Sequence, residues 1–194
     1  MKSQKEAYYH IYNRGVDKRI IYTNDRDYRK FIDGMHKYSA ASGAGKATTR
    51  PVDVICFCLM PNHFHMVVRV KEEDGMTDFM RRLSTGYTMY FNKKYGRSGV
   101  LFESNYKCQL IESDSYLLQV TRYVHLNPLS IASPGWKETG LKDKNRAMEA
   151  VKSYEWSSLR AYTADGKSMG FVECSLPLEI LGGKEKYAEY MEDW

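Results

Sequence analysis

Two histidines stand two residues apart, at positions 63 and 65, in a segment rich in β-branched and aromatic residues. Because the side chains of a strand alternate between its faces, His63 and His65 point the same way. The opposite face is complete without them and carries Phe64, Met66 and Val68. Two imidazoles about 7 Å apart along a strand can converge on one divalent cation. The same spacing also fits two polar residues on a solvent-facing strand, so the pair alone does not establish a metal site.

A tyrosine and an asparagine form a second pair. Tyr123 and Asn127 are four residues apart, hence neighbours on one face of a predicted helix, and Asn127 directly precedes Pro128, where the helix must end. A phenol can act as a nucleophile, and an amide oxygen at a helix end can reach a metal ion. The residues alone favour a plainer interpretation, in which Tyr123 belongs to an aromatic core stripe and Asn127 is a C-terminal cap. His125 lies on another face and is interpreted as a surface or hydrogen-bonded histidine.

The composition is that of a globular protein. The chain has 194 residues, of which 43% are hydrophobic and 27% charged, and this length fits one compact domain with an appended tail. The longest apolar run, residues 54–60, is too short to cross a membrane. The N-terminal residues lack the apolar stretch of a signal peptide. We therefore expect a cytoplasmic protein that does not bind membranes and whose four cysteines are reduced, buried thiols.

The charge is unevenly distributed. The net charge is +5, yet residues 163–194 hold seven acidic and three basic side chains. We divide the chain into a domain over residues 1–162 and an acidic tail over residues 163–194, which we expect to be helical and packed on the domain. A basic body with an acidic tail is one electrostatic footprint of a protein that binds a polyanion, although many other proteins share it.

The pattern of apolar residues predicts four strands, at residues 8–12, 52–60, 63–70 and 106–111. It also predicts helices that begin near residues 24, 77 and 114, the last ended by Pro128. Small residues around positions 40–50 predict a flexible connection. This order predicts an α+β fold with an antiparallel sheet of about four to five strands and helices packed on one face, similar to ferredoxin-like or RNA-recognition folds.

Five short motifs occur together in the order and spacing typical of one family. They are 10–15 (HIYNRG), 60–65 (MPNHFH), 101–103 (LFE), 122–128 (RYVHLNP) and 156–158 (WSS). The sequence resembles the HUH single-tyrosine transposases over about residues 7–162, and within them it is most similar to the REP-associated branch. The combination is far more specific than any single motif.

The resemblance implies a metal-dependent nuclease and strand transferase that acts on single-stranded or hairpin DNA. His63 and His65 match the histidine pair of the family, Tyr123 matches its nucleophile, and Asn127 matches its polar third metal ligand. Insertion-sequence members often carry Gln where this chain has Asn127. The resemblance further implies a covalent link between Tyr123 and a 5′ phosphate, with release of a 3′ hydroxyl that can later rejoin DNA without ATP.

The chemistry of phosphodiesters is consistent with these assignments. A phosphodiester repels nucleophiles through its own negative charge, so a divalent cation on a non-bridging oxygen favours attack. Two histidines and an asparagine are neutral ligands that leave the charge of the cation uncompensated. Mg²⁺ or Mn²⁺ suits such a set, with water and phosphate at the other positions, whereas Zn²⁺ usually requires four tight ligands.

Basic side chains are the candidates for contacts with DNA phosphates. The candidates are Arg14, Lys18, Arg19, Arg81, Arg82, Lys93, Lys94 and Lys107. Tyr8, Tyr12 and Tyr106 could stack on unpaired bases. For any one cation, however, a solvated surface charge is the more common role.

Two alternatives to an active transposase stay open. One is a domesticated, non-catalytic DNA- or RNA-binding module of the same fold. The presence of the complete set of catalytic residue types argues against it. The other is a related nuclease of plasmid transfer or rolling-circle replication, which the short chain disfavours. The sequence also leaves open whether the protein is a monomer or a homodimer in which the tyrosine serves the partner subunit.

Overall fold

The computed structural model describes residues 3–40, 50–141, 143–163 and 169–193. The connection predicted around residues 40–50 falls almost entirely outside these ranges. The strands are β1 (Tyr8–Arg14), β2 (Val52–Met60), β3 (His63–Val70) and β4 (Lys107–Ile111). The helices are the 3-10 turn η1 (Val16–Lys18), α1 (Asp25–Ser39), α2 (Gly75–Tyr95), α3 (Asp114–Leu126), α4 (Leu129–Ala132), α5 (Trp136–Thr139), α6 (Lys144–Ser153), α7 (Leu159–Tyr162), α8 (Ser175–Leu181) and α9 (Lys184–Glu192). None of the helices in these ranges is long and apolar enough to span a membrane.

The four strands form one antiparallel sheet in the order β2-β3-β1-β4. This confirms the predicted α+β class, the strand count and the order of the elements up to α3. A two-residue turn, Pro61 and Asn62, joins β2 to β3, as the sequence predicts. β1 lies between β3 and β4, so its side chains are within reach of both neighbours.

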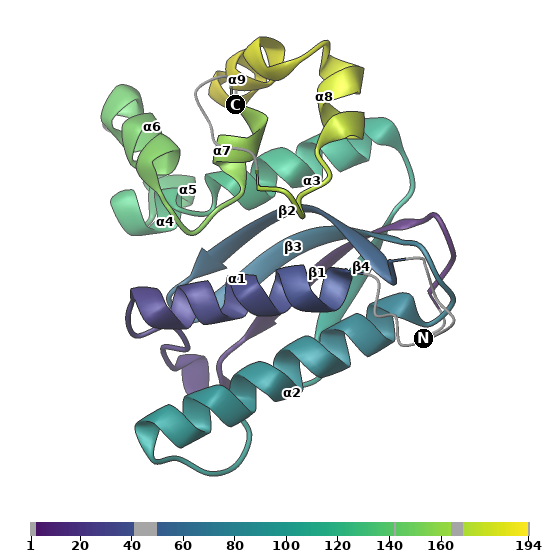
Figure 1. Ribbon diagram of the computed structural model, residues 1–194. Helices are drawn as coiled ribbons and strands as arrows, with labels where there is room; N and C mark the ends of the chain where they lie inside the picture. The colour runs from purple at the N-terminus through teal and green to yellow at the C-terminus, as the bar shows by residue number, and fades with distance from the viewer. Residues whose placement is uncertain (1–2, 41–49, 142, 164–168, 194) are drawn as a thin grey trace.

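Helices cover both faces of the sheet, which corrects the expectation that they pack on one face (Figure 1). α1 and α2 cover one face, and α3 lies across the other with the C-terminal helices above it. The reason lies in β2, whose nine residues are all buried. Its neighbouring residues Phe57 and Cys58 belong to two different apolar cores, and a strand that is apolar on both faces needs a cover on each.

The C-terminal segment packs on the second core. Tyr187 and Met191 of α9 are buried there. Short bridges from Ser157 and Val172 to β2 cover the outer edge of that strand. The four cysteines are free thiols, two of them buried and two half-buried.

Asp27 joins the start of α1 to the end of α2. Its side chain is fully buried and accepts hydrogen bonds from Lys94 at 2.6 Å, Tyr90 at 2.9 Å and Tyr95 at 2.7 Å. It also forms a capping box with Asn24 at the start of α1. Burial alone would raise the pKa of Asp27, but the hydrogen bonds, led by that from Lys94, outweigh it and hold the pKa below its ordinary value.

We expect Asp27→Asn to lower the free energy of unfolding by about 2–4 kcal/mol at neutral pH, because it leaves the ammonium group of Lys94 without its counter-charge. Urea denaturation measures this loss as a shift of the midpoint at an unchanged slope. Because the folded pKa of Asp27 lies below the ordinary 3.8, its contribution is complete above that pH and disappears as pH falls through the folded pKa. The two proteins should therefore converge in stability in acid, and equal stability at neutral pH would contradict the prediction.

Candidate active site

β3 places His63 and His65 on the face of the sheet that α3 covers. Phe64 and Met66 belong to the core on the opposite face, as the alternation of the strand predicts. The two imidazole rings have centroids 5.2 Å apart and planes at 90° to each other. The pair therefore presents two imidazoles to one side of the sheet.

α3 carries Tyr123 over the same face. The hydroxyl of Ser113 accepts the first-turn N–H of Tyr116 at 3.2 Å and caps the helix, and Val124 packs into the core beneath it. Tyr123 is 42% exposed, which corrects its interpretation as part of a core stripe. Its ring meets that of His65 edge to face, with centroids 5.4 Å apart.

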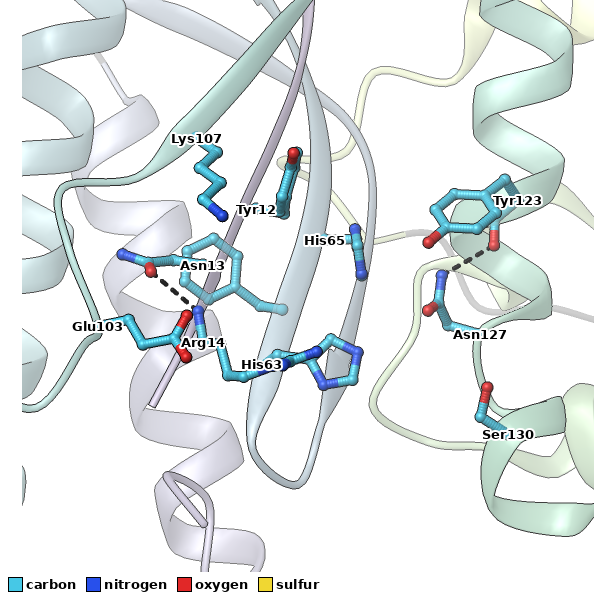
Figure 2. A pocket seen from close by; sticks show the side chains of 11 residues that line it. Tyr12, Asn13, Arg14, His63, His65, Glu103, Lys107, Tyr123, Asn127 and Ser130 are labelled. Carbon is cyan, nitrogen blue, oxygen red and sulfur yellow. Dashed lines mark hydrogen bonds between the residues drawn. The ribbon is translucent and has the colours of Figure 1, made fainter. Parts of the chain in front are cut away.

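Asn127 is the C-cap residue of α3. Its Nδ2 donates to the backbone carbonyl of Tyr123 at 2.9 Å, and its amide oxygen is directed into the cavity on the side of the histidines (Figure 2). The side chains of Asn127 and His63 line the same cavity, so the end of the helix lies beside β3. Asn127 is thus both the cap that the sequence suggests and a polar group that faces the histidine pair.

Asn62 orients His63. Its Nδ2 donates to the backbone carbonyl of Lys18 at 3.1 Å, which directs its Oδ1 to Nδ1 of His63 at 2.7 Å. An amide oxygen only accepts, so Nδ1 of His63 carries the proton of the neutral ring. Nε2 of His63 then keeps its lone pair for a ligand.

His10 of the neighbouring strand β1 contacts His65. Nε2 of His10 lies 3.0 Å from Nδ1 of His65, and the two rings are stacked with centroids 5.2 Å apart. If His65 donates this hydrogen bond, its Nε2 keeps a lone pair; if His10 donates, that Nε2 carries a proton and cannot bind a cation. Only the first arrangement makes His65 a ligand.

These residues surround a cavity of about 420 Å³. The side chains, labelled in Figure 2, come from β1, β3, the start of β4 and the loop before it, and α3 with the residues that follow it. Its lining consists of Tyr12, Asn13, Arg14, His63, Phe64, His65, Glu103, Lys107, Tyr123, Asn127 and Ser130. All four residues that the sequence analysis assigned to catalysis therefore line one cavity within one chain.

Burial lowers the pKa of two histidines of this region and keeps them neutral. It lowers the pKa of His63 to about 4, with a further lowering from the charge of Arg14 and a partial offset from the nearby side chain of Asn127. Burial also lowers the pKa of His10 to about 4. The pKa of Tyr123 is raised by burial and by the nearby Tyr12, so its hydroxyl is protonated at neutral pH.

The donor set can hold a divalent cation with open coordination positions. Two neutral imidazoles and one amide oxygen converge here, and no cluster of three or more His, Cys, Asp or Glu side chains suited to a metal occurs among the described residues. Such a set leaves several coordination positions for water and phosphate oxygens, as Mg²⁺ and Mn²⁺ require. The residues present therefore fit the metal that the sequence analysis expects.

The candidate DNA contacts are distributed unevenly. Arg14 and Lys107 line the site cavity. Arg81 lines an adjacent groove of about 590 Å³ that also includes Asn13 and Tyr106. These three cations therefore lie on one continuous surface.

The other candidates lie outside that cavity. Lys18, Arg19 and Lys93 are on the surface of η1, the segment after it and α2. Arg82 pairs with Asp78 at 2.7 Å, and Lys94 pairs with the buried carboxylate described above. The charge of Lys94 is already compensated within the fold, so the structure gives it a structural role.

α3 is held from its other side by the C-terminal residues. His125 is fully buried and lies 2.8 Å from both the hydroxyl of Tyr187 and that of Ser158. Arg122 donates to the backbone carbonyl of Asp193 at 2.7 Å, and its guanidinium lies 4.1 Å from the centroid of the Tyr190 ring. These contacts fix the helix on either side of Tyr123.

Sequence reasoning assigned no role to His10, Asn62, Glu103 or Ser130. His10, Asn62 and Glu103 stand inside the quoted motifs, and the two-residue alternation of β1 puts His10 on the same face as Tyr12. The missing information was the register of β1 on β3, which pairs Tyr12 with His65. Glu103 lies in the loop before β4 and Ser130 in α4, and local patterns do not predict how either residue reaches the cavity.

Comparisons with known proteins add independent findings. The sequence matches the family model described as "Transposase IS200 like" over residues 4–127, more than half of the chain and a range that includes all four candidate residues. No curated protein matches. A solved structure of a REP-associated tyrosine transposase bound to a REP hairpin has a TM-score of 0.57 at 13% identity, and the match covers 88% of this chain and 93% of that one.

A tRNA(His) guanylyltransferase from Saccharomyces cerevisiae is also matched, at 12% identity over 89% of this chain and 83% of that one, with a TM-score of 0.38. That score is too low to support an argument. At its low identity, the likeness to the REP-associated structure shows a shared fold.

Proposed function

The chain belongs to the family of IS200-like transposases, and from this premise we propose that it cleaves and rejoins single-stranded or hairpin DNA through a covalent bond between Tyr123 and a 5′ phosphate. The observation that supports this most directly is the convergence of Tyr123, His63, His65 and Asn127 on one cavity. All four side chains belong to the same chain, so the proposed reaction needs no second subunit.

In this proposal His63, His65 and Asn127 hold a divalent cation, Mg²⁺ or Mn²⁺. When bound, the cation neutralises charge on a non-bridging oxygen of the scissile phosphate. Asn62 and His10 keep the two imidazoles in the tautomers that present a lone pair to the site. Arg14 and Lys107 add fixed positive charge to the same cavity, which favours a phosphate over neutral ligands.

In the cleavage step, the phenolic oxygen of Tyr123 bonds to phosphorus while the bond between phosphorus and the 3′ oxygen breaks. The phenol loses its proton, and the departing oxygen gains one and becomes a 3′ hydroxyl. Attack by a 3′ hydroxyl on the phosphotyrosine reverses these changes and restores the phenol. Each step exchanges one phosphodiester for another, so rejoining needs no ATP.

The proposed substrate follows from the family and from the cavity. The structural relative named above is bound to a REP hairpin. Here the cavity opens beside Arg81 and Tyr106, a cation and an aromatic ring suited to a phosphate backbone and an unpaired base. We therefore expect a hairpin with a single-stranded flank to be a better substrate than a continuous duplex.

The test is a reaction of the full chain with end-labelled hairpin oligonucleotides and Mn²⁺. A protein–DNA adduct that survives denaturation, with the DNA attached to the peptide that contains Tyr123 in mass spectrometry, would support the proposal. Salt-sensitive binding without cleavage of any oligonucleotide, with or without metal, would instead support the non-catalytic binding module.

Variants of His10 test how His65 is oriented. His10→Leu removes the hydrogen-bond acceptor and is expected to weaken Mn²⁺ binding by about 10–100-fold, measured by electron paramagnetic resonance titration. His10→Gln places an amide oxygen near the position of Nε2 and should restore most of the affinity. If both variants bind Mn²⁺ as the parent protein does, His10 does not position the ligand.

A further inference from the structure

A second cavity, of about 490 Å³, adjoins the first. The two share Tyr12, His65 and Tyr123 in their linings, so the ring of Tyr123 stands between them. The residues that line only the second cavity are His10, Gln109, Tyr116, Gln119 and Val120. Of the residues that line only this cavity, the mechanism described so far uses His10 alone, which orients His65.

The two cavities differ in charge. The first contains Arg14, Lys107 and Glu103, whereas no Lys, Arg, Asp or Glu lines the second. A phosphate is therefore attracted to the first cavity, and the second suits an uncharged group that bonds through hydrogen bonds and ring contacts.

The second cavity offers both kinds of contact. Gln109 on β4 and Gln119 on α3 are exposed, and neither amide forms a hydrogen bond or an electrostatic contact with any residue that the structure describes. Each amide carries a donor and an acceptor that can bond the edge of a base at two points. The rings of Tyr116, Tyr12 and Tyr123 supply flat surfaces for stacking.

We infer that this second cavity binds one unpaired nucleobase next to the scissile phosphate and makes cleavage depend on the identity of that base. The inference rests on the proposed function, because the phosphate that fixes the position of the base is the one that Tyr123 attacks. It assigns Gln109 and Gln119 as specificity-determining residues that take no part in bond breaking. A strand held by its phosphate in the first cavity can reach the second by rotating one adjacent base past the ring of Tyr123.

The experiment is a single-turnover cleavage series on hairpin oligonucleotides with A, C, G, T or an abasic site at each nucleotide that flanks the scissile phosphate. One flanking position should show a preference of about 5–150-fold between the best and the worst base, the range for a two-point contact. Gln119→Ala or Gln109→Ala should reduce this preference at least several-fold and leave cleavage of the abasic substrate unchanged. Gln4→Ala, a substitution of an exposed glutamine that lines neither cavity, is the matched control and should keep the preference.

A second measurement does not depend on turnover. With 2-aminopurine at the same position, binding to the uncleaving Tyr123→Phe protein should quench the fluorescence by stacking, and the alanine variants should weaken that quenching. Equal cleavage of all bases, or a preference that both glutamine variants retain, would overturn the inference and leave the proposed function intact. Absence of any covalent adduct in the parent protein would instead overturn the proposed function.

Discussion

Replacing Tyr123 by Phe is expected to abolish the covalent protein–DNA adduct and to lower the rate of strand cleavage by at least about four orders of magnitude, as for the loss of other enzymatic nucleophiles. The substitution removes the hydroxyl and keeps the ring that packs edge to face against His65. The fold and DNA binding should therefore stay as they are. Denaturing gel electrophoresis of labelled hairpin DNA measures the adduct, and a fluorescence anisotropy titration measures binding.

Tyr12→Phe is the matched control, because Tyr12 is the other tyrosine that lines the site cavity. We expect this variant to form the adduct. An adduct that persists in Tyr123→Phe and disappears in Tyr12→Phe would show that the nucleophile is misassigned. Since the pKa of Tyr123 is raised, the phenolate fraction increases with pH in the neutral range, and the initial rate of the parent protein should increase with it.

Removal of the divalent cation should have a comparable effect. Treatment with a chelator is expected to stop cleavage, and added Mn²⁺ or Mg²⁺ should restore it, because the lost electrostatic stabilisation of the transition state amounts to several kcal/mol. His63→Ala and His65→Ala should each lower the rate by about three orders of magnitude or more at saturating DNA. Cleavage rates across a titration of Mn²⁺ measure both the loss and the affinity for the cation.

His36→Ala provides the comparison for these histidine variants. His36 is an exposed residue of α1 whose ring stacks on Phe171, away from the site, so its loss should change neither the rate nor the metal dependence. Full activity in the presence of excess chelator would contradict the metal assignment. So would variants of His63 and His65 that cleave at the parental rate while circular dichroism shows them folded.

Much of the framework could be predicted from local patterns. The alternation over residues 63–70 predicts both the strand and the common face of His63 and His65, and Pro128 marks the end of the helix that carries Tyr123. These features depend on residues close in sequence, whose geometry is fixed by the regular backbone. The family resemblance, confirmed by the match over residues 4–127, indicates that the pair His63 and His65 acts together with the pair Tyr123 and Asn127. No local pattern indicates this.

The rest depends on contacts between distant residues. The 3.0 Å contact between His10 and His65 joins residues 55 positions apart, and it needs the register of β1 on β3. Lys94 is bound by the carboxylate of Asp27, 67 positions earlier. The residues next to Lys94 in the sequence therefore suggest only an exposed basic surface. The sequence predicts α3 but not its place on the second face, because the pattern of a helix does not tell which face of a sheet it covers; the continuous apolar run of β2 is the one local sign that both faces are covered.

The hydrogen bond between His125 and Tyr187 spans 62 positions, and this separation has a consequence for biosynthesis. A chain emerges from the ribosome from its N-terminus, and early segments begin to fold before later ones exist. Every residue of the catalytic cavity is translated before α9, yet some of the contacts that hold α3, those of His125 with Tyr187 and of Arg122 with Asp193, come from α9 and the residue after it. The helix that carries the nucleophile is therefore fully anchored only after α9 has been translated, and a polypeptide that stops before α9 would carry all the catalytic groups on a less firmly anchored helix.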